Sequence, residues 1–174
     1  IKLARDSGSL MGFAGSGDTG GANMAALTVA LSNDVGEGGF FALSGEMGIA
    51  DLGTPTAIST VSVARFNSLR LDLGSRSVFS GEDRLTLGIS IPIAVTSGSA
   101  DMIVPVSLAG GGAEIRAVDI NLAPEERQME ISISYQMPMS EQSEFLMEVV
   151  HAENYGNVMG ATDSAAVIGL KWSF

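Results

Sequence analysis

Apolar side chains fall on every second position along several stretches of this chain, and this pattern limits the fold more than any other feature. It is cleanest from Leu85 to Val95, where leucine, isoleucine and valine alternate with smaller or polar residues. Successive side chains of a β-strand point to opposite faces, so residues two apart share a face. The pattern therefore predicts strands, and it recurs within residues 25–31, 41–47, 69–73, 102–108, 118–122, 129–137, 145–151 and 164–174, and weakly within 10–13.

The segments between these candidate strands are rich in residues that favour turns. We expect tight reversals at Thr96–Ser99, Gly110–Gly112, Ala123–Glu126 and Ser140–Ser143. Pro92 cannot donate a ladder hydrogen bond, so its strand should lie at an edge or bend there. Residues 57–73 are too long for one strand without a bend, and residues 23–32 are also open to a helix because of their Ala and Leu content.

The sequence therefore predicts an all-β fold, an antiparallel meander of about 8–12 strands. The arrangement is left open between a barrel, complete or incomplete, and a sandwich. We expect one domain over residues 1–174, with residues 1–20 as a candidate loose amino-terminal segment. The chain begins at Ile1 without a Met or a basic and apolar leader, so we expect a processed or partial product.

Composition excludes several classes of function. The net charge of −11 argues against a nucleic-acid partner and against docking on anionic lipid, because like charges repel. The absence of cysteine removes disulfides, thiol catalysis and cysteine metal sites. Aromatic residues make up only 6% of the chain, which is few for the aromatic belts of a membrane barrel.

The carboxy-terminal segment, Ser164 to Phe174, carries one uninterrupted apolar face. In an extended strand this face would consist of Ala166, Ile168, Leu170, Trp172 and Phe174. A closing strand that ends on an aromatic residue is typical of bacterial outer-membrane β-barrels. We therefore predict that these five residues form a membrane-insertion strand, against the alternative of an ordinary half-buried terminal strand.

Four segments of the carboxy-terminal half resemble the carboxy-terminal region of subtilisin-like autotransporters. They are Leu85–Pro92, Val95–Ala100, Asn121–Glu130 and Ser134–Pro138, and the similarity covers about residues 80–174. The resemblance implies the translocator-side barrel rather than the protease passenger. It also implies a place in the bacterial outer membrane, with lipid and the barrel-assembly machinery as partners. The expected role is to anchor and export a passenger.

No residue pattern points to catalysis, a cofactor or a metal. The nearest match to a subtilisin-like serine motif is Gly53–Ala57, which lacks the serine. His151 is the single histidine and has no nucleophile motif beside it. Gly15–Gly20 matches a dinucleotide fingerprint but is expected by chance in a glycine-rich chain. The acidic pairs lack calcium-loop spacing and are interpreted as solvated turn charge; they are Asp34 with Glu37, Glu82 with Asp83, and Glu125 with Glu126.

We therefore expect a non-enzymatic protein with no catalytic, cofactor-binding or metal-binding residue. The four arginines Arg65, Arg70, Arg76 and Arg84 are left open between lining a lumen and pairing with acids across strands. The rival hypothesis is a soluble extracellular β-sandwich subunit at the cell surface that self-assembles into a homo-oligomer, filament or matrix. It rests on the small-residue, aromatic-poor composition and on strand edges open to other copies.

Overall fold

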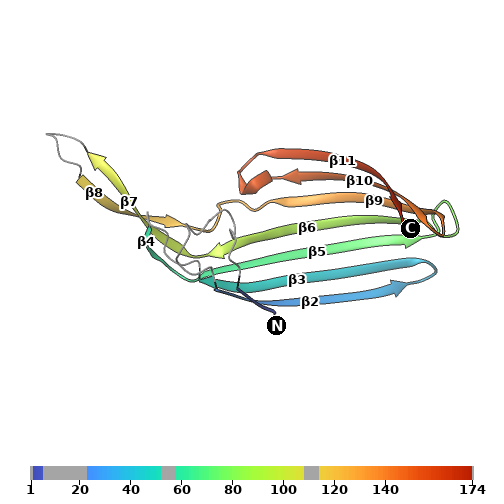
Figure 1. The fold of residues 1–174 in the computed structure, drawn as a ribbon, viewed down its shortest axis with the longest axis horizontal. Helices are drawn as coiled ribbons and strands as arrows, with labels where there is room; N and C mark the ends of the chain where they lie inside the picture. The colour runs from blue at the N-terminus through green and yellow to red at the C-terminus, as the bar shows by residue number, and fades with distance from the viewer. Residues whose placement is uncertain (1, 6–22, 52–57, 108–113, 174) are drawn as a thin grey trace. The chain divides into compact units, whose positions relative to one another are not determined.

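The structure, a computed structural model, describes residues 2–5, 23–51, 58–107 and 114–173. Strands make up nearly all of this part of the chain, together with one short 3-10 turn, η2 (Tyr155–Asn157) (Figure 1). The strands are β1 (Lys2–Arg5), β2 (Asn23–Val35), β3 (Gly39–Asp51), β4 (Ile58–Val61), β5 (Ala64–Arg76), β6 (Arg84–Ser97), β7 (Ser99–Ser107), β8 (Glu114–Asn121), β9 (Met129–Ser140), β10 (Ser143–Glu153) and β11 (Thr162–Trp172). The predicted all-β class is confirmed.

Two sheets contain all of these strands. The larger has eight strands in the order β1-β2-β3-β5-β6-β9-β10-β11, and the smaller has three in the order β4-β7-β8. Most neighbours in the larger sheet follow each other in sequence, as in the predicted antiparallel meander. β11 has only β10 as a neighbour, so the described strands form an open sheet and not a closed barrel.

Several boundaries match the sequence pattern closely. The stretch expected to bend within residues 57–73 is interrupted at Ser62 and Val63, between β4 and β5. The ladder between β6 and β9 ends at the pair Ser90–Glu130, two residues before Pro92, so Pro92 has no β9 partner. The reversal expected at Ser140–Ser143 joins β9 to β10. Three predicted segments, residues 10–13, Gly15–Gly20 and Gly110–Gly112, lie outside the described residues.

The strand predicted within residues 25–31 is confirmed as part of β2, and the alternative of a helix over residues 23–32 is excluded, because strand pairing outweighs the weak helical preference of Ala and Leu. One local expectation was wrong. The reversal expected at Thr96–Ser99 does not occur: only Gly98 separates the end of β6 from the start of β7, and β7 pairs with β4 and β8 instead of β6. Turn-forming residues here allow the chain to leave one sheet and enter the other.

The chain divides into two compact units. Unit 1 contains residues 1–28, 46–67 and 93–124, and unit 2 contains residues 29–45, 68–92 and 125–174. Unit 1 has a small core in which Phe66 packs with Ala26 and Ala50, and Met24 lies against them. In its three-stranded sheet, Ser62 follows β4 and Ser99 is the first residue of β7. A hydrogen bond links the two, since the Ser99 amide donates to Ser62 Oγ over 2.7 Å.

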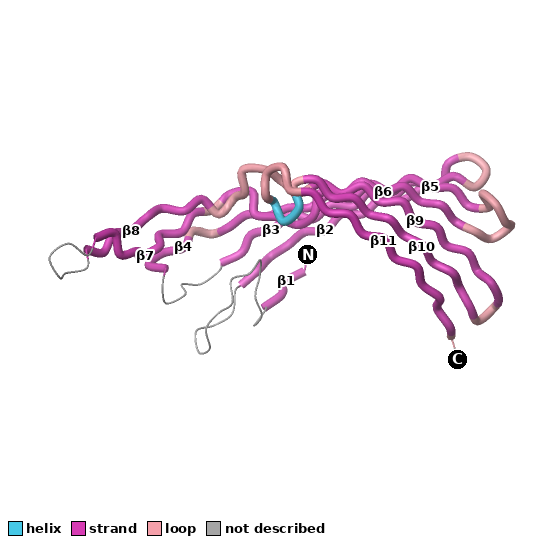
Figure 2. The backbone as a smooth tube through the Cα atoms, turned by 90° about the horizontal axis from the view of Figure 1, so that it is seen from above, coloured by secondary structure: helices cyan, strands magenta, loops and turns pink. Residues whose placement is uncertain are grey.

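Unit 2 is a curved single layer of long strands, most clearly seen where β9, β10 and β11 run side by side (Figure 2). Few of its side chains are buried; they include Phe40, Asp83 and Ala152. A soluble unit of this kind would be stabilised chiefly by an apolar core. The described residues of unit 2 form very little apolar core, and many of its large apolar side chains lie on the surface instead.

Candidate functional site

The register of β6, β9, β10 and β11 separates two chemically different faces of unit 2. Residues directly opposite each other in an antiparallel sheet lie on the same face. Leu87 lies opposite Ile133, Ile133 lies opposite Val149, and Val149 lies opposite Ala166. We call this side the apolar face; its apolar members are Leu85, Leu87, Ile89, Ile131, Ile133, Tyr135, Met137, Phe145, Met147, Val149, Ala166, Ile168 and Leu170, and it also carries the polar residues Ser143, His151 and Ser164 toward its two ends.

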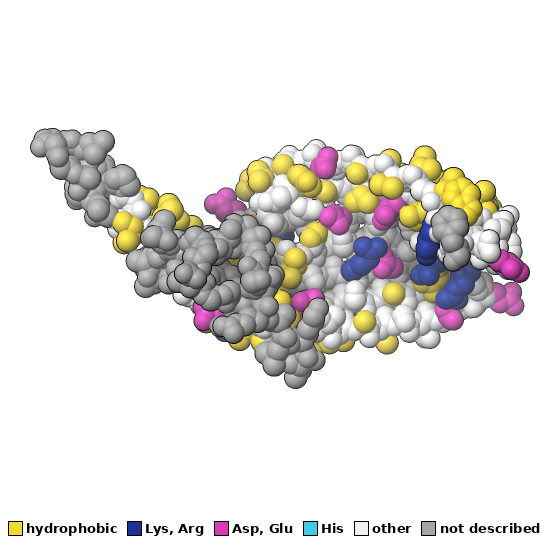
Figure 3. Space-filling model, in the orientation of Figure 1, with side chains coloured by type: hydrophobic (Ala, Val, Ile, Leu, Met, Phe, Trp, Pro, Cys, Tyr) yellow, Lys and Arg dark blue, Asp and Glu magenta, His cyan; other side chains and the backbone are white. Residues whose placement is uncertain are grey.

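The opposite side, which we call the polar face, carries mostly polar and charged residues. Its rows contain Thr86, Ser90, Glu130, Ser132, Ser134, Gln136, Glu144 and Glu148, interrupted by Leu146, Val150 and Val167. Figure 3 shows charged side chains of both signs over the middle of this sheet. Unit 2 therefore has one aliphatic and one mainly hydrophilic surface.

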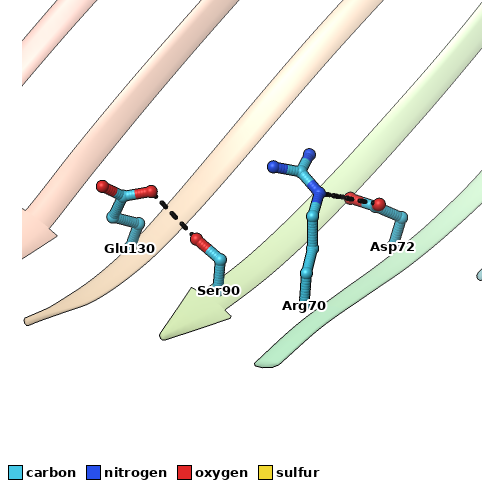
Figure 4. A network of polar contacts seen from close by, with 4 residues as sticks. All are labelled: Arg70, Asp72, Ser90 and Glu130. Carbon is cyan, nitrogen blue, oxygen red and sulfur yellow. Dashed lines mark hydrogen bonds and ion pairs between the residues drawn. The ribbon is translucent and has the colours of Figure 1, made fainter. Parts of the chain in front are cut away.

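A network of polar contacts crosses the polar face from β5 to β9 (Figure 4). Arg70 Nε donates to both carboxylate oxygens of Asp72, over 3.0 and 2.8 Å. Ser90 Oγ donates to Glu130 over 2.9 Å, and the Gln128 amide donates to the other Glu130 oxygen over 2.7 Å. These bonds hold charged groups in place on the polar face without an apolar core beneath them.

Gly88 provides the space in which this network assembles. A Cβ at this position would press against Ser132 Oγ and an oxygen of Asp72, and it would also crowd a terminal nitrogen of Arg70. Side chains from β5 and β9 therefore meet directly above the Gly88 backbone. Glu130 and Glu148 also attract the Arg70 guanidinium electrostatically.

The apolar face is exposed over most of its described extent, and Leu85, Tyr135, Met137 and Phe145 near the hairpin end are half-buried. Ile133, near the middle of β9, is 50% exposed, and Ile168 on β11 is 72% exposed. Other apolar side chains with substantial exposure on these strands are Leu87, Ile89, Ile131, Met147, Val149 and Leu170. An aliphatic surface of this size is unusual on a soluble monomer and is typical of sites that contact another protein or a membrane.

The predicted insertion strand coincides with β11. Leu170 lies opposite Phe145, Ile168 opposite Met147 and Ala166 opposite Val149, so these residues extend the apolar face to its last strand. Trp172 is the last residue of β11 and is exposed. Phe174 lies outside the described residues. The structure thus brings the described apolar members of this strand onto one surface at a free sheet edge.

The hairpin that joins β5 to β6 is held closed by Asp83, which is only 1% exposed. Its carboxylate accepts hydrogen bonds from the amides of Val78, Phe79 and Ser80 over 2.6, 2.8 and 3.0 Å. The Tyr135 hydroxyl donates to the same carboxylate over 2.9 Å, and the rings of Phe79 and Tyr135 meet edge-on. Sequence reasoning interpreted Asp83 as solvated turn charge, and that interpretation was wrong.

These contacts determine the direction in which the pKa of Asp83 is shifted. Burial of the carboxyl acts to raise the pKa of Asp83, but the hydrogen bonds from Phe79, Tyr135, Val78 and Ser80 together outweigh it. The pKa of Asp83 is therefore lowered from its ordinary value. The ionised carboxylate is the form that closes the hairpin.

Two arginines meet one aromatic ring at the hairpin end of the polar face. The guanidinium carbon of Arg84 lies 4.0 Å from the centre of the Phe40 ring, and that of Arg76 lies 5.2 Å from it. The ring also lies directly over Gly74, where a Cβ would collide with it. Phe40 is 6% exposed and is held between backbone and cation.

The remaining candidate residues carry ordinary roles. His151 Nδ1 lies 2.8 Å from Ser164 Oγ on the neighbouring strand and is exposed. Gly53–Ala57 lies outside the described residues. Among the residues that the structure describes, no group of three or more His, Cys, Asp or Glu side chains is placed to hold a metal. No helix in the described part of the chain has the length and apolar character needed to cross a membrane.

The sequence did not decide whether the four arginines line a lumen or pair with acids across strands, and in the structure they lie in different environments. Arg70 pairs with Asp72 on its own strand, whereas Arg76 pairs across strands with Asp34 over 2.9 Å. Arg84 lies on Phe40. Arg65 is exposed in β5. The Arg–Phe cluster was not predicted, because residues 40, 76 and 84 are brought together only by the pairing order of β3, β5 and β6.

No protein-family model, curated protein or solved structure matches this chain. The two faces of unit 2 and the residues that form them are therefore the features that indicate a function.

Proposed function

We propose that unit 2 is a membrane-embedded segment of a non-enzymatic bacterial outer-membrane β-barrel. Its apolar face would contact lipid and its polar face would line the interior. Its role would be to anchor and export a passenger, as the autotransporter resemblance implies. The observation that carries this proposal is the exposed aliphatic face backed by a hydrophilic one, the reverse of the arrangement in a soluble sheet that covers a core.

The dimensions of the strands support the proposal. β9, β10 and β11 contain 12, 11 and 11 residues, and a transmembrane strand needs roughly 9–11 residues. The connection between β9 and β10 is short, consisting of Glu141 and Gln142. Ser173 lies at the same end, since its amide donates to the Gln142 carbonyl over 2.9 Å. Short turns on the side of the carboxy-terminus are typical of outer-membrane barrels.

The single tryptophan of the chain offers a direct test. Trp172 is exposed at the end of the apolar face, so lipid contact would place its indole among acyl chains or at their border. The purified chain is reconstituted in vesicles that contain lipid brominated in the acyl chain. We expect strong quenching of Trp172 fluorescence and little quenching by aqueous acrylamide. Quenching by acrylamide alone would refute membrane embedding of β11.

The insertion role of the last strand has its own test. Deleting Phe174 removes the terminal aromatic residue that follows β11, and Ile168→Gln weakens the same face within the strand. We expect both changes to reduce assembly into the outer membrane, measured by fractionation and by heat-modifiable mobility on a gel. The matched control is Lys171→Gln, which alters the opposite face of β11. Unchanged assembly of the first two variants would exclude this role.

A second candidate function is a self-assembling extracellular subunit, and the free edge of β11 favours it. β11 pairs with β10 along all of its length and has no partner on its other side among the described strands. Such an edge can pair with another copy of the chain. Sedimentation without detergent separates the two proposals: ordered, soluble assemblies would support the subunit, whereas a requirement for detergent or lipid would support the barrel.

A further inference from the structure

The Arg76–Arg84–Phe40 cluster brings two cationic side chains to one aromatic ring. Arg76 has a carboxylate partner, Asp34, but Arg84 has none among the described residues. Both guanidinium groups lie close to one ring, so each positive charge raises the energy of the other. In a chain with a net charge of −11, two guanidinium groups that share one ring and have a single ion-paired carboxylate between them need an explanation.

The cluster borders open space on both sides. One cavity of about 400 Å³ is lined by Ser32, Asn33, Asp34, Phe40, Arg76 and Arg84. A second, of about 320 Å³, also contains Arg76 and Arg84, but its lining includes the acidic residues Glu82, Asp83 and Glu144, which would repel an anion. Figure 3 shows Lys and Arg side chains gathered at this end of the sheet. The two arginines therefore face solvent-accessible volume that is large enough for a small ligand.

We propose that the cavity of about 400 Å³, which Phe40, Arg76 and Arg84 line, binds a phosphate group through Arg84 and Arg76. The phosphate is either free or carried by a larger molecule. A guanidinium presents paired N–H donors that match the oxygens of phosphate. Phe40 fixes the Arg84 guanidinium over its ring without using those donors. A phosphate bridging the two arginines would relieve their repulsion and would complete the neutralisation that Asp34 begins on Arg76.

The rigidity of the cluster explains why it favours binding. Phe40 cannot move toward β5, because the backbone of Gly74 lies directly against its ring. Arg76 is anchored at its backbone, where its amide donates to the Gly38 carbonyl over 2.8 Å. Less conformational freedom is then lost when a ligand binds than would be lost by two mobile surface arginines.

The test is calorimetric titration of the purified full chain, in a zwitterionic detergent, with inorganic phosphate at constant ionic strength. We expect saturable binding that Arg84→Gln weakens by at least about tenfold. The matched control Arg65→Gln removes the same charge from an exposed position in unit 1 and should leave binding within about twofold. Equal weakening by both variants would show only a general charge effect and would overturn the proposal.

Further arms identify the form of the ligand. Binding of glycerol 3-phosphate with the same dependence on Arg84 would support a phosphate carried on a larger molecule. Binding of inorganic phosphate alone would support the free ion. Acetate that binds as tightly as phosphate would overturn the assignment of phosphate. Arg84→Lys keeps the charge but loses the paired donors, so it should bind more weakly than the wild-type chain while circular dichroism shows the same strand content.

Discussion

Introducing a charge at Ile133 distinguishes a membrane-facing surface from a water-facing one. Ile133 lies near the middle of β9, between Leu87 on β6 and Val149 on β10, and is half exposed. In water, Ile133→Arg would forfeit only part of the burial of one side chain, about 1 kcal/mol. At the lipid-facing midplane of a barrel an arginine costs about 2–4 kcal/mol, or roughly 30- to 1000-fold in the folding equilibrium.

The next residue along β9 supplies the control. Ser134 points to the polar face and lies opposite Glu148, so Ser134→Arg should change the free energy of unfolding by less than about 1 kcal/mol. Urea titration of each variant in lipid vesicles, followed by Trp172 fluorescence, measures the difference. A cost for Ile133→Arg within about 1 kcal/mol of that for Ser134→Arg would refute the assignment of the apolar face to lipid.

Three further predictions follow from the packing of unit 2. Gly74→Val should destabilise the fold by about 1–3 kcal/mol because its side chain collides with Phe40, whereas Gly169→Val, which faces open space, should not; equal midpoints in urea would contradict this. Asp83 has a lowered pKa, so the stability it adds is present above about pH 4 and falls as the pH drops through its folded value; the protection of the 78–80 amides against hydrogen exchange, relative to their intrinsic rate at each pH, should fall in acid, and Asp83→Asn should abolish that pH dependence. Arg70→Gln should lower the midpoint of thermal unfolding, because Asp72, Glu130 and Glu148 lose the cation that they share; a midpoint equal to that of the wild-type chain would contradict this.

The strands could be predicted from the sequence because the period of two is strong where both faces are chemically distinct. β9 shows this well: Ile131, Ile133 and Tyr135 alternate with Ser132 and Ser134, and the structure places the two sets on opposite faces. The same pattern predicted that β11 carries its apolar residues together. Alternation depends on neighbours in sequence, so it is visible without knowledge of strand order.

Features that depend on strand order could not be predicted in this way. The reversal expected near Gly98 was wrong, because turn residues do not specify whether a chain turns back or enters a different sheet. The burial of Asp83 depends on Tyr135, which is far away in sequence and is brought near by the pairing of β6 with β9. Likewise, Phe40 meets Arg84 only because β3, β5 and β6 are neighbours.

The low aromatic content of the chain argued against a membrane barrel, but the positions of the aromatic residues along the strands of unit 2 favour one. Phe79 and Tyr135 contact each other beside the β5–β6 hairpin, and Phe145 lies next to Tyr135. Phe145 and Trp172 lie at the end of β10 and β11 that is next to the turn formed by Glu141 and Gln142. Most aromatic residues of unit 2 therefore lie toward one end of the strands, Tyr155 lies at the other end in η2, and the middle of the apolar face is aliphatic. Outer-membrane barrels carry aromatic residues near both interfaces and aliphatic residues between them, so this distribution supports the proposed lipid contact even though the total is small.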